Sequence, residues 1–291
     1  MENKELKILK PMKYWWLYFL ISLSVIIPGT YSLIRWGLKP SIDFTGGSTI
    51  VWDTKLDETA LRDLAKSSEV EIREMSAKGG VWTISTGPLT KEVYQGYKAK
   101  VEGVKELTFD TVGPALGSEL IKKTLYAVLT SASLILFYVA YRFKNIKFGV
   151  SAILAMLHDS LVLLGVFSLL GHFAGVEVDT LFVTALLTIL SFSVHDTIVV
   201  YDRIRELKKK HGYLDFEDIV NRAVVETMGR SINNSLTIIF MLLAMYLLGG
   251  DTTKWFIFAL LIGTISGTYS STFTAAPLLI AWDKFIHSRK K

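Results

Sequence analysis

Residues 178–201 have the sequence VDTLFVTALLTILSFSVHDTIVVY, and this stretch decides the fold class. A helix needs about 20 predominantly apolar residues to cross the hydrocarbon core of a bilayer, so the stretch predicts a membrane span. His195 and Asp196 interrupt it near its end. A charged side chain inside a membrane is costly unless it is paired or neutralised, so Asp196 is the first candidate functional residue.

Five other stretches have the same character, and together they predict an α-helical polytopic membrane protein with six spans. The chain has 291 residues, of which 51% are hydrophobic and 20% charged, with a mean hydropathy of +0.38. Cysteine is absent, which excludes a disulfide framework, a thiolate metal site and a cysteine nucleophile. The six predicted spans are 14–34, 124–141, 148–176, 178–201, 231–248 and 255–282.

Basic residues mark one side of the membrane, because cytoplasmic loops carry an excess of Lys and Arg. With the N-terminus inside, the inner segments hold the basic residues of 4–13, 142–147, 203–230 and 284–291, whereas the short outer turns hold only Lys254. We therefore expect residues 1–13 and 283–291 to be cytoplasmic termini. The net charge of +5 is then mostly a topology signal, and the expected contact is membrane lipid, with no nucleic acid.

The first span, within residues 14–36, is expected to be an uncleaved anchor, because its apolar core is too long for a signal peptide and no small-x-small site follows. The other five spans fill residues 124–282. Between them, residues 37–123 are polar enough to form a small extracytoplasmic domain.

The pattern of this domain predicts the order β-α-β-β-α-β, the ferredoxin-like arrangement. Strands are expected where apolar and β-branched residues alternate, and helices where apolar residues recur at helical spacing. Trp52 and Trp82 are interpreted as core residues, and no catalytic or metal-binding constellation is visible in this domain. The expected strands are 48–52, 69–75, 81–86 and 104–112, and the expected helices are 56–66 and 88–100.

One span, an external domain and five more spans form the plan of half a resistance-nodulation-division (RND) transporter. Local motifs in the expected order resemble the SecF branch of the SecD/SecF export family. They are IDFTGGS at 42–48, VGPALGSEL at 112–120, AMLHD at 155–159, DTIVVYDRIRE at 196–206 and GTISGTYSS at 263–271. The motif residues assigned structural roles are Asp43, Gly46, Gly47, Gly113, Gly117, His158, Asp159, Arg203, Gly263 and Gly267. A fused SecDF would need roughly a second such unit, which is not expected here.

The resemblance implies an auxiliary subunit of protein export that is not an enzyme and has no cofactor. Its implied partners are SecD, the SecYEG channel, YajC and the translocating preprotein, and its implied energy source is the proton motive force. Asp196 matches the family's proton-linked aspartate, and Arg230 falls where the family carries its important arginine. Ionised Asp196 would pair with a cation and protonated Asp196 would release it, giving a proton-coupled switch.

Alternatives remain open for four residues, Asp196, Arg230, His195 and Ser193. The carboxylate could form a static ion pair, and Arg230 could simply obey the positive-inside rule by snorkelling. His195 stands where SecF proteins usually have Asn, so it either joins the proton path or packs as a neutral hydrogen-bonding residue. Ser193, one helical turn before Asp196, either bonds near it or packs between helices.

The two His-Asp pairs, at His158 and at His195, raise an intramembrane metal site as a rival, although no HExxH-like spacing supports it. Arg203 is expected to make a loop contact or to anchor the helix at the cytoplasmic side. Gly263 and Gly267 form a small-xxx-small face that could pack within the chain or against SecD. The domain glycines are interpreted as turn or hinge residues.

Two further functions compete with protein export. An RND-like exporter of small molecules or lipids shares the architecture, but it normally has a larger external domain and a second half. A membrane enzyme would need a nucleophile and a base at suggestive spacing, and the serines at 270–271 have no such histidine.

Overall fold

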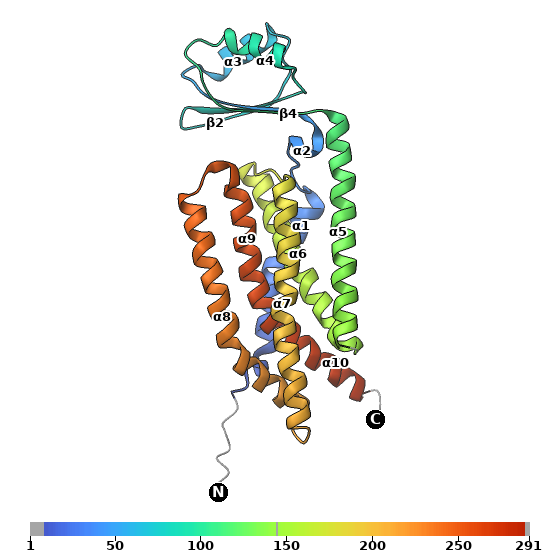
Figure 1. Cartoon of the computed structure of the whole chain (residues 1–291). Helices are drawn as coiled ribbons and strands as arrows, with labels where there is room; N and C mark the ends of the chain where they lie inside the picture. Colours follow the sequence, from blue (N-terminus) through green and yellow to red (C-terminus); the bar gives the residue numbers. More distant parts are fainter. Residues whose placement is uncertain (1–8, 144, 289–291) are drawn as a thin grey trace. The chain divides into compact units, whose positions relative to one another are not determined.

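The structure is a computed structural model that describes residues 9–143 and 145–288. Parts of the basic clusters, including Lys4, Lys7, Lys144 and residues 289–291, lie outside the described residues. The chain divides into two compact units: one contains the chain up to Lys39, Val128–Val176 and Leu181 onward, and the other contains Pro40–Ala127 with Glu177–Thr180. Each is described by itself (Figure 1).

Six helices in the described part of the chain are long and apolar enough to cross a membrane, which confirms the predicted number. A short 3₁₀ turn, η1 (Pro11–Tyr14), precedes the first of them. Their bounds are α1 (Trp15–Arg35), α5 (Pro114–Phe143), α6 (Ile146–Ala174), α7 (Thr180–Lys210), α8 (Phe216–Leu248) and α9 (Asp251–Ser270).

Helix α8 begins at Phe216, well before the predicted span that starts at residue 231. Its first turns carry charged residues and so escape a hydropathy criterion, but Ile219, Val220, Ala223 and Val224 are buried in the bundle core. Their spacing is that of one helix face. Amphipathic packing, and not hydropathy, therefore decides where this helix begins.

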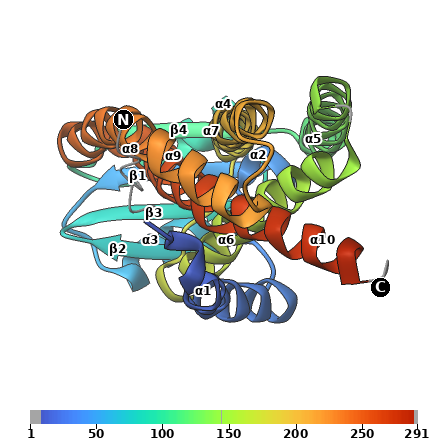
Figure 2. The same ribbon diagram turned by 90° about the horizontal axis from the view of Figure 1, so that it is seen from below.

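The predicted sixth span is not one straight helix. Helix α9 continues into a π-helical segment, η2 (Ser271–Ala275), and then into α10 (Ala276–Ser288), which leaves the direction of α9 (Figures 1 and 2). Pro277 is the second residue of α10, where its missing N–H removes a helical hydrogen bond. A π segment beside a proline is a recognised cause of a kink.

Helices α1 and α6 pack side by side with a constant register (Figure 2). The hydroxyls of Ser32 and Ser168 lie 2.7 Å apart, and Gly29 faces Gly165 three residues earlier on each helix. A Cβ atom built on Gly165 would lie 2.6 Å from the Cα atom of Gly29. The two backbones therefore approach so closely that neither glycine has room for a side chain.

The segment between α1 and α5 forms a four-stranded antiparallel sheet in the order β2-β3-β1-β4. This order and the element sequence β1-α3-β2-β3-α4-β4 confirm the predicted ferredoxin-like fold. The bounds are β1 (Gly47–Asp53), α3 (Glu58–Lys66), β2 (Ile72–Lys78), β3 (Val81–Thr86), α4 (Lys91–Ala99) and β4 (Lys105–Val112).

The core of this domain lies between the sheet and its two helices. Trp52 is fully buried, as expected, and its indole N–H donates to the Tyr94 hydroxyl at 3.2 Å, whereas Trp82 is only partly buried. Burial raises the pKa of Tyr97 to about 12, so its hydroxyl stays protonated and donates to the Leu61 carbonyl at 3.0 Å.

Candidate functional site

Asp196 lies on α7 and is buried, with 5% of its surface exposed. The Ser231 hydroxyl of α8 donates to Asp196 Oδ2 at 2.6 Å. Within residues 9–143 and 145–288, this is the one hydrogen bond that reaches the carboxylate from another helix. Asp196 is therefore a membrane-embedded carboxylate with a single polar contact on the neighbouring helix.

Arg230 directly precedes Ser231 on α8, but its side chain is exposed. The ion pairs among the described residues do not include Arg230, so the anticipated Asp196–Arg230 contact is not formed in this arrangement. Successive residues on a helix point about 100° apart, which explains why one of the pair faces Asp196 and the other does not.

His195 is exposed and lines a cavity of about 490 Å³ between α5 and α7. Tyr138 and Ser191 also line this cavity. Arg142 and Asp202 are part of its lining as well, and they form an ion pair with 2.5 Å between Arg142 Nη2 and Asp202 Oδ2. His195 therefore faces the α5 side of α7, while Asp196 faces α8. Its participation in a proton path stays a prediction.

Asp159 on α6 is the most densely bonded carboxylate of the bundle, and its side chain is fully buried. The Ser193 and Ser270 hydroxyls donate to its Oδ2 at 2.5 and 2.6 Å, and the Ser266 hydroxyl donates to its Oδ1 at 2.5 Å. His158 Nδ1 lies 3.0 Å from the same Oδ1. Three helices, α6, α7 and α9, therefore meet at one carboxylate.

His158 extends this network to α1. Its Nε2 lies 2.9 Å from the Ser22 hydroxyl, which lies 3.5 Å from the Tyr269 hydroxyl. The Tyr269 hydroxyl in turn donates to the Tyr18 carbonyl at 2.6 Å. Sequence reasoning named His158 and Asp159 but missed their serine and tyrosine partners, which lie on helices far away in the chain.

The hydroxyl of Ser193 donates to Asp159 on the neighbouring helix α6, and not to Asp196 one turn along α7, so the alternative in which Ser193 packs between helices fits the structure. The described residues contain no group of three or more His, Cys, Asp or Glu side chains arranged to hold a metal ion. The two His-Asp pairs have different environments. His158 and Asp159 bond serines inside the bundle, whereas His195 lines an open cavity.

Arg203 lies farther along α7 and joins it to α8. Its guanidinium contacts Glu226 of α8 at 2.5 Å and Glu206 of its own helix at 2.5 Å. Such partly exposed pairs contribute at most about 1 kcal/mol each, so their main effect is to fix helix orientation.

Gly263 and Gly267 pack against α7 within this chain. A Cβ atom on Gly263 would lie 2.1 Å from Ile189 Cδ1, and one on Gly267 would lie 3.3 Å from Ser193 Cβ. Of the two alternatives left open by the sequence, the structure has the internal contact. This close approach also brings Ser266 and Ser270 to Asp159.

The glycines of the two domain motifs have three different environments. Gly46 and Gly47 adopt φ values of +68° and +140°, which other residues rarely adopt. A Cβ atom on Gly117 would lie 2.9 Å from the Phe44 carbonyl oxygen, so the start of α5 packs against the short helix α2 (Ile42–Thr45). Gly113 has open space around it. Gly46 and Gly47 fit a tight turn, whereas Gly117 is a helical glycine at a close backbone contact, and a role of these glycines as hinges stays a prediction.

Asp43 of the first motif binds the beginning of α7. Its Oδ2 accepts hydrogen bonds from the Thr180 backbone N–H at 3.1 Å and from the Thr180 hydroxyl at 2.9 Å. The Ser41 N–H donates to the Val178 carbonyl at 2.9 Å beside it. A carboxylate at a helix N-terminus satisfies otherwise unpaired N–H groups and is favoured by the helix dipole.

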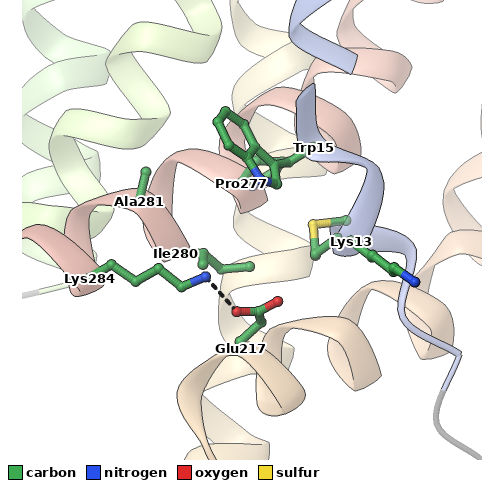
Figure 3. Close-up of a pocket in the computed structure, with 8 residues that line it drawn as sticks. Lys13, Trp15, Glu217, Pro277, Ile280, Ala281 and Lys284 are labelled. Atoms are coloured by element: carbon green, nitrogen blue, oxygen red, sulfur yellow. Dashed lines mark ion pairs between the residues drawn. The ribbon is translucent and has the colours of Figure 1, made fainter. Parts of the chain in front are cut away.

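A second cavity, of about 320 Å³, lies between η1, the first turn of α1, the start of α8 and α10 (Figure 3). The Lys284 ammonium and the Glu217 carboxylate form an ion pair of 2.7 Å beside it, with Trp15 and Pro277 on the opposite side. None of the residues predicted for proton coupling lines this cavity.

Comparison with known proteins gives a consistent result. Residues 93–285 match the C-terminal part of the SecD/SecF protein-export membrane protein family. The protein translocase subunit SecF of Thermobaculum terrenum is 40% identical over 94% of this chain and 93% of its own length. The SecF of Anaerolinea thermophila is 39% identical over 92% of both chains.

The crystal structure of SecDF from Thermus thermophilus, a translocon-associated membrane protein, has a TM-score of 0.83 to this chain at 31% identity. The similarity covers 98% of this chain but 40% of the SecDF chain.

Six membrane-length helices, a bundle with buried carboxylates and a small ferredoxin-like domain after the first helix define a polytopic membrane protein whose fold is similar to part of SecDF. The full-length similarity to SecF subunits narrows this class further. The chain belongs to the SecD/SecF family of protein-export membrane proteins.

Proposed function

We propose that this chain acts in protein translocation as the SecF-type, non-enzymatic subunit of an export complex, and that proton movement through its helical bundle drives the work. The family and the SecF relatives support the role in translocation. The observation that carries the proton-coupling part is the buried carboxylate of Asp196, with its single hydrogen bond from α8.

The contrast between the two buried carboxylates supports this assignment. An ionised carboxylate can accept about four hydrogen bonds, and Asp159 has four such contacts. Asp196 has one from α8 and no ion pair within the described residues. Burying an ionised carboxylate with so few partners costs several kcal/mol, so this arrangement favours the neutral form of Asp196, whose proton can then be exchanged.

Arg230 supplies the cation for the other state. It is adjacent to Ser231, so a rotation of α8 by about 100°, or a swing of the long arginine side chain, would replace the serine hydroxyl by the guanidinium at Asp196. Deprotonation of Asp196 favours that exchange, because an ionised carboxylate attracts a guanidinium strongly at low dielectric. Proton release and a change in the α7–α8 packing are thereby linked.

SecD is the proposed partner, because the similar SecDF chain is much longer than the part that this chain resembles. A second membrane-embedded aspartate would come from SecD. SecYEG, YajC and the translocating preprotein complete the proposed complex. It lies in a prokaryotic plasma membrane with both termini of this chain cytoplasmic, as the basic flanks favour.

The test is precursor processing in cells depleted of their own SecF that carry this chain with its cognate SecD. Wild type should restore processing, and Asp196→Asn, which removes the titratable proton but keeps the size, should not. Asp202→Asn is the matched control, because Asp202 lies on the same helix and is 38% exposed. Equal membrane levels of the three proteins make the comparison valid.

Processing by Asp196→Asn at the wild-type rate would refute the proton-coupling role while leaving the translocation role intact. Failure of wild type itself, with SecD present, would refute the translocation role.

A further inference from the structure

Asp159 has the contacts of an ionised carboxylate. Three serine hydroxyls donate to it, those of Ser193 and Ser270 to Oδ2 and that of Ser266 to Oδ1, whereas Asp196 accepts a single such bond from a neighbouring helix. Hydrogen bonds accepted by both oxygens of a carboxylate favour its ionised form. Such a charge, fully buried among membrane-length helices, needs a counter-charge nearby.

The hydrogen bonds around His158 show where the counter-charge is. The Tyr269 hydroxyl gives its proton to the Tyr18 carbonyl, which can only accept, so its oxygen is left to accept from Ser22. With Ser22 donating to Tyr269 at 3.5 Å, the Ser22 oxygen is left to accept from His158 Nε2 at 2.9 Å.

The other ring nitrogen, Nδ1, faces the ionised Asp159 and must donate as well. Both ring nitrogens therefore carry hydrogen, which makes the ring an imidazolium.

We propose that His158 and Asp159 form a second proton-binding site in the helical bundle, distinct from Asp196, in which one proton is held on the imidazolium against the carboxylate. With the proton, the pair is neutral overall. Without it, a net negative charge remains inside the bundle, and the donor chain from His158 to the Tyr18 carbonyl is broken.

The proton is linked to helix packing because the same network joins four helices. Ser22 comes from α1, Ser193 from α7, and Ser266 and Ser270 from α9. Among the described residues, the titratable group that faces the pair is the Tyr269 phenol on α9, and Asp196 lies one turn beyond Ser193 on α7, where it bonds Ser231 of α8. Loss of the proton would loosen α1 and α9 from α6, and would alter the face of α7 that carries Asp196.

Nitrogen-15 NMR of the full chain in lipid bilayers, with labelled histidine, tests this directly. The chain has five histidines, and His158→Gln assigns the signal of interest. At about pH 7.5, about one in ten ordinary exposed histidines is doubly protonated. His158 is expected to be doubly protonated in most molecules. Asp159→Asn should convert it to the singly protonated form, and Asp202→Asn should leave it unchanged.

A singly protonated His158 in the wild-type chain would overturn the proposal, and so would a doubly protonated His158 in Asp159→Asn. The wild-type spectrum needs no substituted network residue. If His158→Gln does not accumulate, replacing the other four histidines leaves His158 as the single signal. The protonation state of His158 is measured without export activity, so this test is independent of the role proposed for Asp196.

Discussion

Replacing Gly165 by alanine should separate α1 from α6. The new Cβ atom would lie 2.6 Å from the Gly29 Cα atom, whereas carbon atoms in contact are about 3.5–4.0 Å apart. Both atoms belong to regions that cannot rotate away, so the two helices must move apart by about 1 Å.

The cost can be worked from this displacement. Overpacking of this kind costs about 1–3 kcal/mol. The Ser32–Ser168 hydrogen bond of 2.7 Å lies one turn away and would lengthen past the usual limit, which removes about 0.6 kcal/mol for a bond between membrane helices. We therefore expect Gly165→Ala to destabilise the bundle by about 2–3 kcal/mol.

The absence of cysteine in this chain makes cross-linking a clean assay. Ser32→Cys and Ser168→Cys together should form a disulfide readily, because their side-chain oxygens are already 2.7 Å apart. Adding Gly165→Ala should slow this cross-link severalfold and lower the unfolding temperature of the uncross-linked chain. Gly149→Ala on the same helix is the control, because a Cβ atom there meets nothing within 4 Å.

Cross-linking and thermal stability of Gly165→Ala that match those of Gly149→Ala would show that α1 and α6 do not approach through these glycines. The packing argument would then be wrong.

Two further predictions concern the domain that contains the β-sheet. The hydrogen bond from Lys98, and then that from Tyr94, lowers the pKa of Glu106 below its ordinary value of 4.5, so this contribution to stability is complete above pH 4.5 and is lost as the pH falls through the lowered value. Lys98→Met should lower the unfolding temperature at pH 7 but not in acid, so that the unfolding temperature of the variant falls less than that of wild type as the pH drops below 4.5. An equal fall in both proteins would contradict this. Asp43→Ala should lower the free energy of unfolding by about 1–2 kcal/mol, because it removes both hydrogen bonds to Thr180. Thr180→Val loses only the hydroxyl bond and should lower it less. Thermal unfolding of the full chain measures both effects, and the reverse order would refute the capping role.

The number of spans and the topology of the small domain could be predicted from sequence because they depend on local periodicity. Alternating strands and long apolar runs are visible in single windows. The start of α8 at Phe216 could not be predicted in this way, because its first turns are stabilised by packing of Ile219 and Ala223 against residues distant in sequence.

The polar site shows the same division. Asp196, His158 and Asp159 could be singled out because charges in apolar runs are rare. The serines that surround Asp159 could not, because Ser193 and Ser266 reach it from α7 and α9, and serines in membrane helices have many other uses. Ser231 could not be predicted either, because the sequence favours its charged neighbour Arg230 as the partner of Asp196.

We propose that Asp196 exchanges the proton that drives export, and a measurement of proton flux tests this role most directly. Vesicles containing this chain and its cognate SecD would be placed under an imposed pH gradient, and flux would be compared for wild type, Asp196→Asn and Asp202→Asn. We expect proton flux with wild type and with Asp202→Asn, and loss of proton flux with Asp196→Asn. Proton flux at the wild-type rate with Asp196→Asn would contradict the proposed role of Asp196.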